Sequence, residues 1–178
     1  MKLTIKRASA EDAHIIGYIH SRTWIDQYKE IADAKIISQM TPERRAARIA
    51  QNISANLWEY YLIKLNGAPI GFLVLGASKE DDAASDTGEV AALCLAAEHQ
   101  NRGYEARTLD FAVDKLLSYG FQTIYFWTDE GDISMHTLLS ARDFSFKGYT
   151  RSKFIGTHIV HYRYERGPDR AAINDEDF

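Results

Sequence analysis

The chain has 178 residues, of which 46% are apolar and 12% aromatic, which is enough to build the core of one domain. Its formal net charge is -4, because 21 Lys and Arg stand against 25 Asp and Glu, and this balance argues against a nucleic-acid partner. A single cysteine, Cys94, excludes an intrachain disulfide and a multi-cysteine zinc site. No run reaches the roughly 18 apolar residues of a membrane span, and residues 1–10 lack the apolar segment of a signal peptide, so we expect a cytoplasmic protein without a membrane partner.

The N-terminal part of the chain predicts a strand, two helices and a hairpin. Residues 3–8 alternate as a strand does, and Ser9 with Asp12 forms a capping-box pattern for a helix that runs to about Tyr28. Thr41 before Pro42 predicts a second helix start. The two strands of the predicted hairpin are the β-prone runs 57–64 and 69–75, which the turn signal Asn66-Gly67 joins.

The acidic stretch 79–88 is short of large apolar residues and is predicted to be an exposed loop. Its acids could attract a cationic amine, but a charge-rich loop is more often simply solvated. These acids are Glu80, Asp81, Asp82 and Asp86.

The C-terminal part predicts a strand, a helix and a parallel strand. A strand over 89–95 precedes a helix over 104–119 with Gly120 as its stop, and a strand over 123–128 follows, as in a right-handed crossover. The remaining predicted elements are a short helix over 133–141 and strands over 145–149 and 158–165. We expect one domain over residues 1–166 and a polar tail over 167–178.

The order of these elements resembles the GCN5-related N-acetyltransferases, the GNAT family, over about residues 3–165. The strongest likeness is GEVAALCLAAEHQNRGYEARTLDFAVDKLLSYGF, which is similar to the family's fourth strand, pyrophosphate loop and third helix. The segment HSRTWIDQYKEI is similar to its first helix. The resemblance implies an α/β (α+β) fold in which a mostly antiparallel, twisted sheet of about seven strands is flanked by about four helices.

The resemblance also implies a function. An acetyl group would pass from acetyl-CoA to a primary amine of a small molecule or peptide, by direct attack in a ternary complex. The alternative is a relative that has lost transfer activity and serves as a CoA-binding or protein-binding module. The sequence is compatible with either a homodimer or a monomer.

The family's loop reads Gln or Arg, two residues, Gly, one residue, then Gly or Ala. Gln100, Gly103 and Glu105 occupy these places. Backbone N–H groups and the helix dipole would face the diphosphate there, and a carboxylate at about 6 Å costs roughly 0.7 to 2.8 kcal/mol. The structural alternative is that Glu105 only interacts favourably with the helix dipole. The residues that the resemblance assigns to this site are Gln100, Asn101, Arg102, Gly103, Tyr104, Glu105, Ala106 and Arg107.

Amine transfer needs a base, because an alkyl ammonium with pKa about 10.4 must lose a proton before it attacks. The resemblance implies that Glu89 takes this proton through water; a solvated carboxylate at a strand end is the alternative. Backbone N–H groups of Leu93, Cys94 and Leu95 would hold the pantetheine arm and polarise the thioester carbonyl. The Cys94 thiol itself is expected to be buried and inert.

The family's usual acid, a helical tyrosine, is missing from DISMHTLLSARDF, where Leu139 takes its place. His136 lies three residues earlier on roughly the same helical face and could donate instead, although it could equally be an ordinary half-buried histidine. Trp24 and Tyr28 would line the acceptor pocket or merely pack. His158 and His161 are three apart in a predicted strand, on opposite faces, so we predict no metal site.

Overall fold

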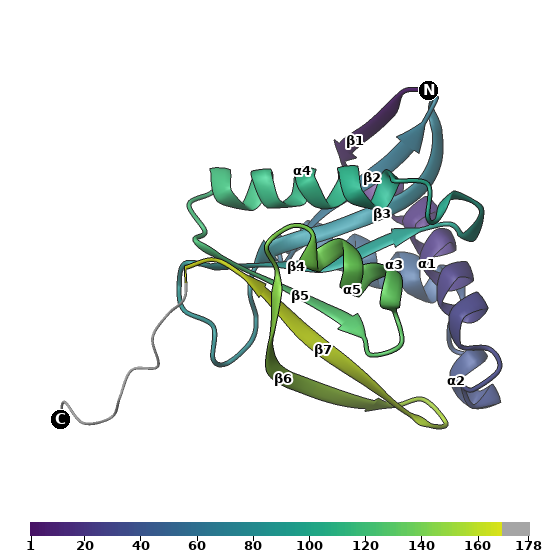
Figure 1. Cartoon of the computed structure of the whole chain (residues 1–178). Coiled ribbons are helices and arrows are strands. Elements are labelled where there is room, and N and C mark those ends of the chain that lie inside the picture. The colour runs from purple at the N-terminus through teal and green to yellow at the C-terminus, as the bar shows by residue number, and fades with distance from the viewer. Residues whose placement is uncertain (169–178) are drawn as a thin grey trace.

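The computed structural model describes residues 1–168 and folds them around one sheet of seven strands in the order β1-β2-β3-β4-β5-β7-β6 (Figure 1). Among the pairs within these residues, β4 and β5 run parallel and all other neighbours are antiparallel. The strands are β1 Leu3–Arg7, β2 Glu59–Leu65, β3 Ala68–Ala77, β4 Thr87–Leu95, β5 Thr123–Asp129, β6 Ser145–Phe154 and β7 His158–Arg166.

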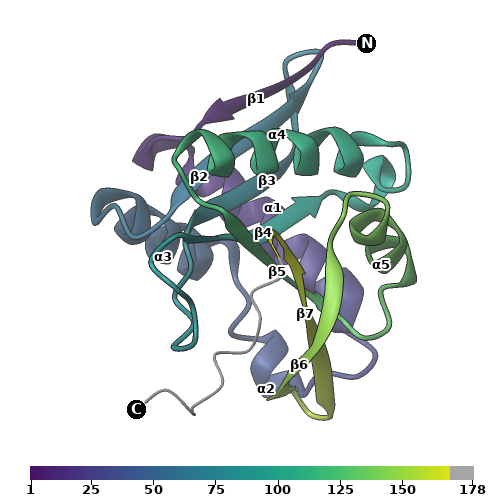
Figure 2. The ribbon, with the colours of Figure 1, turned by 60° about the vertical axis from the view of Figure 1, so that its left-hand side comes forward.

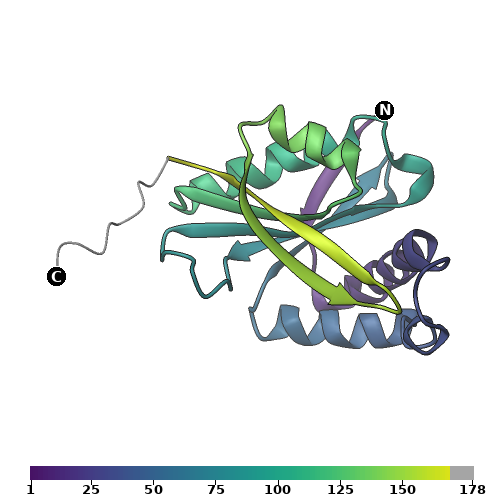
Figure 3. The same cartoon turned by 60° about the horizontal axis from the view of Figure 1, so that its bottom comes forward.

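Helices cover both faces of the sheet, as Figure 3 shows. Leu109 and Leu139, from the helices on one face, share a core with Val90 of β4. On the other face, Ile16 and Ile49 pack against the β2 and β3 side chains. The helices are α1 Ala13–Tyr28, α2 Ala34–Ile37, α3 Pro42–Ser54, α4 Tyr104–Ser118 and α5 Ile133–Ser140; α4 and α5 lie on the first face, and α1 and α3 on the second.

The predicted fold class, a mostly antiparallel seven-stranded α/β sheet, is confirmed. The described residues hold five α-helices rather than about four, because α2 is a single turn too short to produce a periodic pattern. β4 begins two residues earlier than predicted, and β6 continues to Phe154. None of the helices in residues 1–168 is long and apolar enough to cross a membrane.

β4 and β5 pair over only four residues each, from Thr87 to Val90 on β4. Beyond that point the two strands diverge (Figure 1). A register shift between Val74 and Leu75 on β3 leaves Ala91 without a partner there, which is the pattern of a β-bulge that bends β4. One edge of β4, from Ala91 to Leu95, therefore faces away from β3 with no strand beside it.

Two close approaches position α1 and the β6–β7 hairpin. A side chain at Gly17 would place its Cβ 2.6 Å from the backbone nitrogen of Ala46, so α1 and α3 can meet backbone to backbone only through this glycine. At the hairpin tip, the Asp33 N–H donates to the Ile155 carbonyl at 2.6 Å, and Gly156 has a φ of 115°. Figure 2 shows the tip beside α2. The hairpin is thus tied to the N-terminal helices.

The loop between β3 and β4, residues 78–86, is not simply solvated, contrary to the sequence-based expectation. Glu80 accepts from Trp127 Nε1 at 3.0 Å and pairs with Arg151 at 3.3 Å. Asp82 accepts two bonds from Arg163, at 2.8 and 2.6 Å. These arginines lie about 70 to 80 residues further along the chain, so local composition could not reveal them. We call residues 78–86 the strap, because they cross the face of β5, β7 and β6.

Candidate active site

A groove of about 1260 Å³ opens where β4 and β5 diverge. The free edge of β4 forms its floor, from Ala91 to Leu95, and the end of β5 forms one side. Its other walls come from elements far apart in the sequence: α1, the loop 97–106, α5, and the β6–β7 hairpin. The groove therefore joins the parts of the chain that sequence reasoning assigned to the cofactor and to the acceptor.

The floor of the groove offers backbone groups rather than reactive side chains. Gln100 Nε2 donates to the Leu95 carbonyl at 2.8 Å and ties the following loop to the end of β4. Cys94 Sγ lies 3.0 Å from Thr23 Oγ1, and burial raises the pKa of the thiol to about 11. The thiol stays protonated at neutral pH and is a poor nucleophile.

The loop before α4 has the geometry of an anion site. Asn101 and Gly103 have φ values of 57° and 82°, and a Cβ at Gly103 would meet nothing within 4 Å. Left-handed turns of this kind direct successive N–H groups into a concave surface, and here the N-terminus of α4 adds its dipole. The donor set fits a diphosphate, but Glu105 Oε1 already accepts from the Asn101 N–H at 2.8 Å. The chain's own carboxylate occupies a place that an anionic ligand would use.

Five of the eight residues predicted for this loop line the groove: Gln100, Asn101, Gly103, Glu105 and Ala106. Arg102, Tyr104 and Arg107 are not among the lining residues. Tyr104 is buried in the core beneath the loop, with its ring 6.5 Å from that of His99. The arginines would have to swing in to neutralise a phosphate.

Glu89 is buried, with 6% exposure, and does not line the groove. Its Oε2 accepts from Ser78 Oγ at 3.0 Å. Burial raises the pKa of the carboxyl, the hydrogen bond from Ser78 opposes that rise, and the nearby charge of Glu80 adds to it. Because Glu89 is not among the groove-lining residues, it can exchange protons with the groove only through an intermediary.

α5 does not present the side chains that the predicted acid role requires. Leu139 has 0% exposure and belongs to the core, whereas Met135 and Leu138 face the groove. The ring of His136 lies 5.4 Å from that of Tyr164, and its Nε2 is 2.9 Å from the Glu130 carbonyl. His136 therefore sits against β7, outside the groove lining, and is badly placed to protonate a leaving group on the floor.

Trp24 and Tyr28 both line the groove, with ring centroids 5.0 Å apart. The Tyr28 hydroxyl donates to Asp129 Oδ2, and Asp129 Oδ1 lies 2.8 Å from His161 Nε2. Burial, and then the bond to Asp129, raise the pKa of Tyr28. Burial favours a higher pKa at Asp129 too, but the bonds from His161 and Tyr28 outweigh it and lower that pKa. The carboxylate stays ionised and the phenol neutral.

Sequence reasoning gave Asp129 no role and weighed His161 only as a metal ligand, whereas the pairing of β5 with β7 places the two residues opposite each other. The signal that could have pointed to Asp129 was a carboxylate directly after the apolar run of β5. His158 contacts Ser152 Oγ at 3.0 Å instead, so the two histidines have separate partners. In residues 1–168, no group of three or more His, Cys, Asp or Glu could hold a metal ion.

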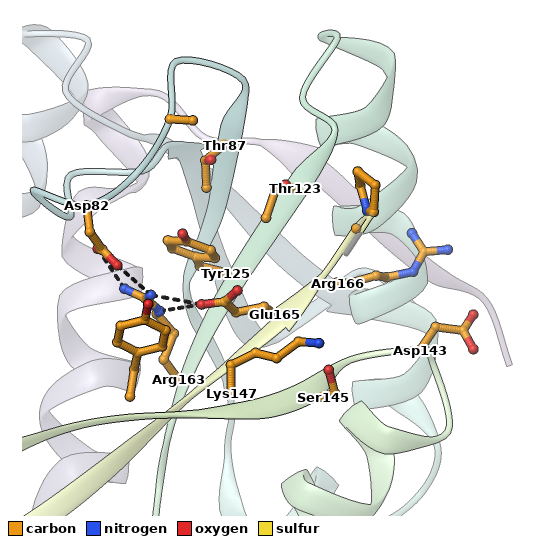
Figure 4. Close-up of a pocket in the computed structure, with 14 residues that line it drawn as sticks. Asp82, Thr87, Thr123, Tyr125, Asp143, Ser145, Lys147, Arg163, Glu165 and Arg166 are labelled. Carbon is orange, nitrogen blue, oxygen red and sulfur yellow. Dashed lines mark hydrogen bonds and ion pairs between the residues drawn. The ribbon is translucent and has the colours of Figure 1, made fainter. Parts of the chain in front are cut away.

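A second cavity, of about 620 Å³, lies at the opposite end of β5 and β7 (Figure 4). Arg163 stands at its centre with 2% exposure, bonded to Asp82 and, through Nε, to Glu165 at 2.9 Å. Its guanidinium lies between two rings, 4.2 Å from the centroid of Tyr125 and 3.8 Å from that of Tyr149. Burial acts to lower the pKa of Arg163, but its carboxylate partners raise it overall.

The chain matches the Acetyltransferase (GNAT) family over residues 24–144, more than half of its length. It therefore belongs to that family. No curated protein sequence matches the chain.

Solved structures share the fold at low sequence identity. YncA from Salmonella typhimurium, solved with its cofactor acetyl-CoA, superposes with a TM-score of 0.73 at 16% identity over 99% of each chain. The PaiA N-acetyltransferase of Thermoplasma acidophilum, in complex with coenzyme A, gives 0.70 at 15% over 94% of this chain and 100% of that one. A ribosomal-protein-alanine N-acetyltransferase of Brucella melitensis gives 0.71 at 12% over 93% and 99%. The first two neighbours bind acetyl-CoA or coenzyme A.

Proposed function

We propose that this acetyltransferase-family chain moves an acetyl group from acetyl-CoA to a primary amine, by direct attack in a ternary complex. The observation that carries the proposal is the groove, which runs without interruption from the loop at Asn101 and Gly103, along the free edge of β4, to the wall of α1 and β7. The binding of acetyl-CoA and coenzyme A by neighbours of the same fold supports it. We also propose a cytoplasmic location, on composition alone.

The residues of the groove would divide the work between binding and proton transfer. The loop N–H groups hold the diphosphate once Glu105 has moved aside. Backbone N–H groups between Leu93 and Leu95 hold the pantetheine arm and stabilise the oxyanion as the amine attacks. Trp24 packs beside the acceptor. These contacts need backbone and aromatic surface, which agrees with the lack of reactive side chains on the floor.

Glu89 is the proposed base, acting through water. Its raised pKa makes the ionised carboxylate a stronger proton acceptor than an exposed glutamate. A water relay is required because Glu89 does not reach the groove lining. No acid is assigned to the departing thiolate, since a thiol with pKa near 8.5 can leave largely unprotonated at neutral pH.

Binding is tested first by thermal unfolding with acetyl-CoA. At one hundred times Kd the stabilisation is about 2.7 kcal/mol, which raises Tm by roughly 5 to 11 °C for a chain of this size. Release of free thiol is then followed across a panel of amines. The absence of any thermal shift would refute both cofactor binding and transfer.

Replacing Glu89 with Gln tests the base. The kcat should fall about 10² to 10⁴-fold, while the Kd for acetyl-CoA stays unchanged, because the side chain acts on the acceptor and not on the cofactor. His161→Asn is the matched comparison, since His161 lines the groove beside Asp129. A larger loss in His161→Asn than in Glu89→Gln would transfer the role of base to the histidine.

A second candidate function is a binding module without transfer activity. Two observations favour it: the carboxylate of Glu105 on the loop N–H, and the buried leucine at the position of the usual tyrosine. Such a protein would show the thermal shift with acetyl-CoA but release no thiol with any amine of the panel. Steady thiol release that depends on an amine would exclude it.

A further inference from the structure

One face of β6 carries a row of large side chains that runs from the second cavity to the groove. Tyr149, Arg151 and Lys153 alternate with residues on the opposite face, as the two-residue period of a strand requires. They face the same side as Arg163 and His161 of β7, because Tyr149 lies over Arg163 and Arg151 pairs with His161. Arg151 and Lys153 both line the groove.

The strap supplies acids for two cations of this row. Asp82 binds Arg163, and Glu80 binds Arg151, one strand further out. Lys153 comes next along β6, and no acidic residue among those described forms an ion pair with it. The row therefore passes from a fully compensated arginine to an uncompensated lysine at the groove.

The surroundings of Lys153 add to the positive charge. On α1, burial, then the charges of Arg45 and Lys153, lower the pKa of His20 to about 4, so this groove-lining imidazole stays neutral and compensates nothing. Arg45 has no carboxylate partner among the described residues, and its Nε is buried without a hydrogen bond. Arg45 does not line the groove, and the lining also carries the carboxylates Asp26, Glu105, Asp129, Glu130 and Asp132. Among the described lining residues, Arg151 is paired with Glu80, so the cation that lacks a carboxylate partner is Lys153.

We infer that the acceptor amine carries an anionic group, a carboxylate or phosphonate, and that the Lys153 ammonium binds it. The inference rests on the proposed function and names the substrate class of the same groove. The reacting amine must reach the edge of β4, whereas Lys153 stands on the β6–β7 hairpin. The amine end and the anionic end of the acceptor would therefore contact different walls of the groove. A diamine would place its second cation against Lys153 and be disfavoured.

The test compares matched acceptors on the full chain with saturating acetyl-CoA: phenylalanine, its methyl ester, phenylethylamine and spermidine. The wild type should show the highest kcat/KM with phenylalanine. Lys153→Met should raise KM for phenylalanine about tenfold, the effect of losing a charge-assisted contact, and leave the ester unchanged. Lys6→Met, on the far edge strand β1, is the matched control and should change neither KM.

The outcomes separate this inference from the proposed function. Thiol release with the ester, the plain amine or spermidine at least as fast as with phenylalanine would overturn the anionic acceptor and leave the transferase intact. An equal rise in KM for phenylalanine and its ester in Lys153→Met would also overturn it. If no amine releases thiol, phenylalanine is titrated calorimetrically into the complex with coenzyme A. Binding that Lys153→Met weakens would support the inference, and no binding would refute it.

Discussion

The two ends of the β5–β7–β6 face differ in how they treat charge. At the second cavity, Arg163 is enclosed by Asp82, Glu165 and two aromatic rings, so its charge is neutralised within the chain and its bonds to Asp82 hold the strap in place. At the groove, the lining residue Lys153 has no carboxylate partner among the described residues. Charges that are paired within the chain contribute to stability, whereas charges left uncompensated beside a groove are available to a ligand. The same three strands thus divide into a structural end and a candidate binding end.

The largest expected effect breaks the structural end. Arg163→Met should lower the free energy of unfolding by about 3 kcal/mol, because it leaves Asp82 and Glu165 facing each other without their cation. Urea unfolding measures it. Adding Asp82→Asn should recover part of the loss, while the Kd for acetyl-CoA should stay unchanged in both variants. If Arg163→Met is as stable as the wild type, the ion pairs of Arg163 with Asp82 and Glu165 do not stabilise the fold.

Next comes a pH effect at the groove end. The folded-state pKa of His20 is about 4, below its ordinary value of 6.5. Between pH 6.5 and pH 4, therefore, His20 is protonated in the unfolded chain and neutral in the folded chain. Stability should therefore fall as pH drops from 6.5 to 4, by up to about 3 kcal/mol. His20→Gln should flatten this part of the profile, measured as Tm against pH. His14→Gln, an exposed position on the same helix, should keep it; equal slopes in all three proteins would contradict the assignment.

A third prediction concerns α5. Leu139→Tyr should cost about 1 to 3 kcal/mol through overpacking and should not raise turnover, because the position is in the core. Leu138→Tyr places the same hydroxyl in the groove and should be tolerated. Chemical unfolding and thiol release are compared for the two variants. A gain in turnover at Leu139 without loss of stability would mean that the position reaches the reacting sulfur after all.

The smallest effect sharpens the picture of the loop. Glu105→Gln keeps a hydrogen-bonding side chain near the Asn101 N–H but removes the charge, and Glu105→Gly removes both. Both should bind acetyl-CoA more tightly, by up to about 2 kcal/mol at low salt, and the gain should shrink as salt screens the repulsion. Calorimetric titration at two ionic strengths measures it. Unchanged or weaker affinity would indicate that the diphosphate does not lie at this loop.

Local chemistry explains what the sequence could predict. The Asn66-Gly67 turn was readable because both residues adopt positive φ, 51° and 89°, which these two residue types tolerate. α4 was readable from its apolar period and from Gly120, which also has positive φ. By contrast, the partners of Glu80 and Asp82, and the approach of His161 to Asp129, depend on strand order and register between distant segments. No pattern within a short stretch encodes them.

The same limit applied to the candidate site. Gln100, Gly103 and Glu105 were found through a loop pattern, and the structure places all three in the groove. Glu89 and His136 were assigned from position along the chain, which says nothing about the direction a side chain takes, and neither lines the groove. Their catalytic roles stay predictions. Lys153 gave no signal in the sequence, because a lysine on a strand is ordinary until its neighbours are known.

Gly17 gives the groove a point of adjustment far from the reacting end. α1 carries the wall residues His20, Trp24 and Tyr28 on the turns after this glycine, and α1 rests there directly on the backbone of α3. A single added methyl group would have to push the two helices apart, and the wall would move with α1. The width of the groove therefore depends on the lack of a Cβ at Gly17, on the side of α1 that faces α3. Substitutions at Gly17 offer a way to change which acceptors fit without altering any residue that lines the groove.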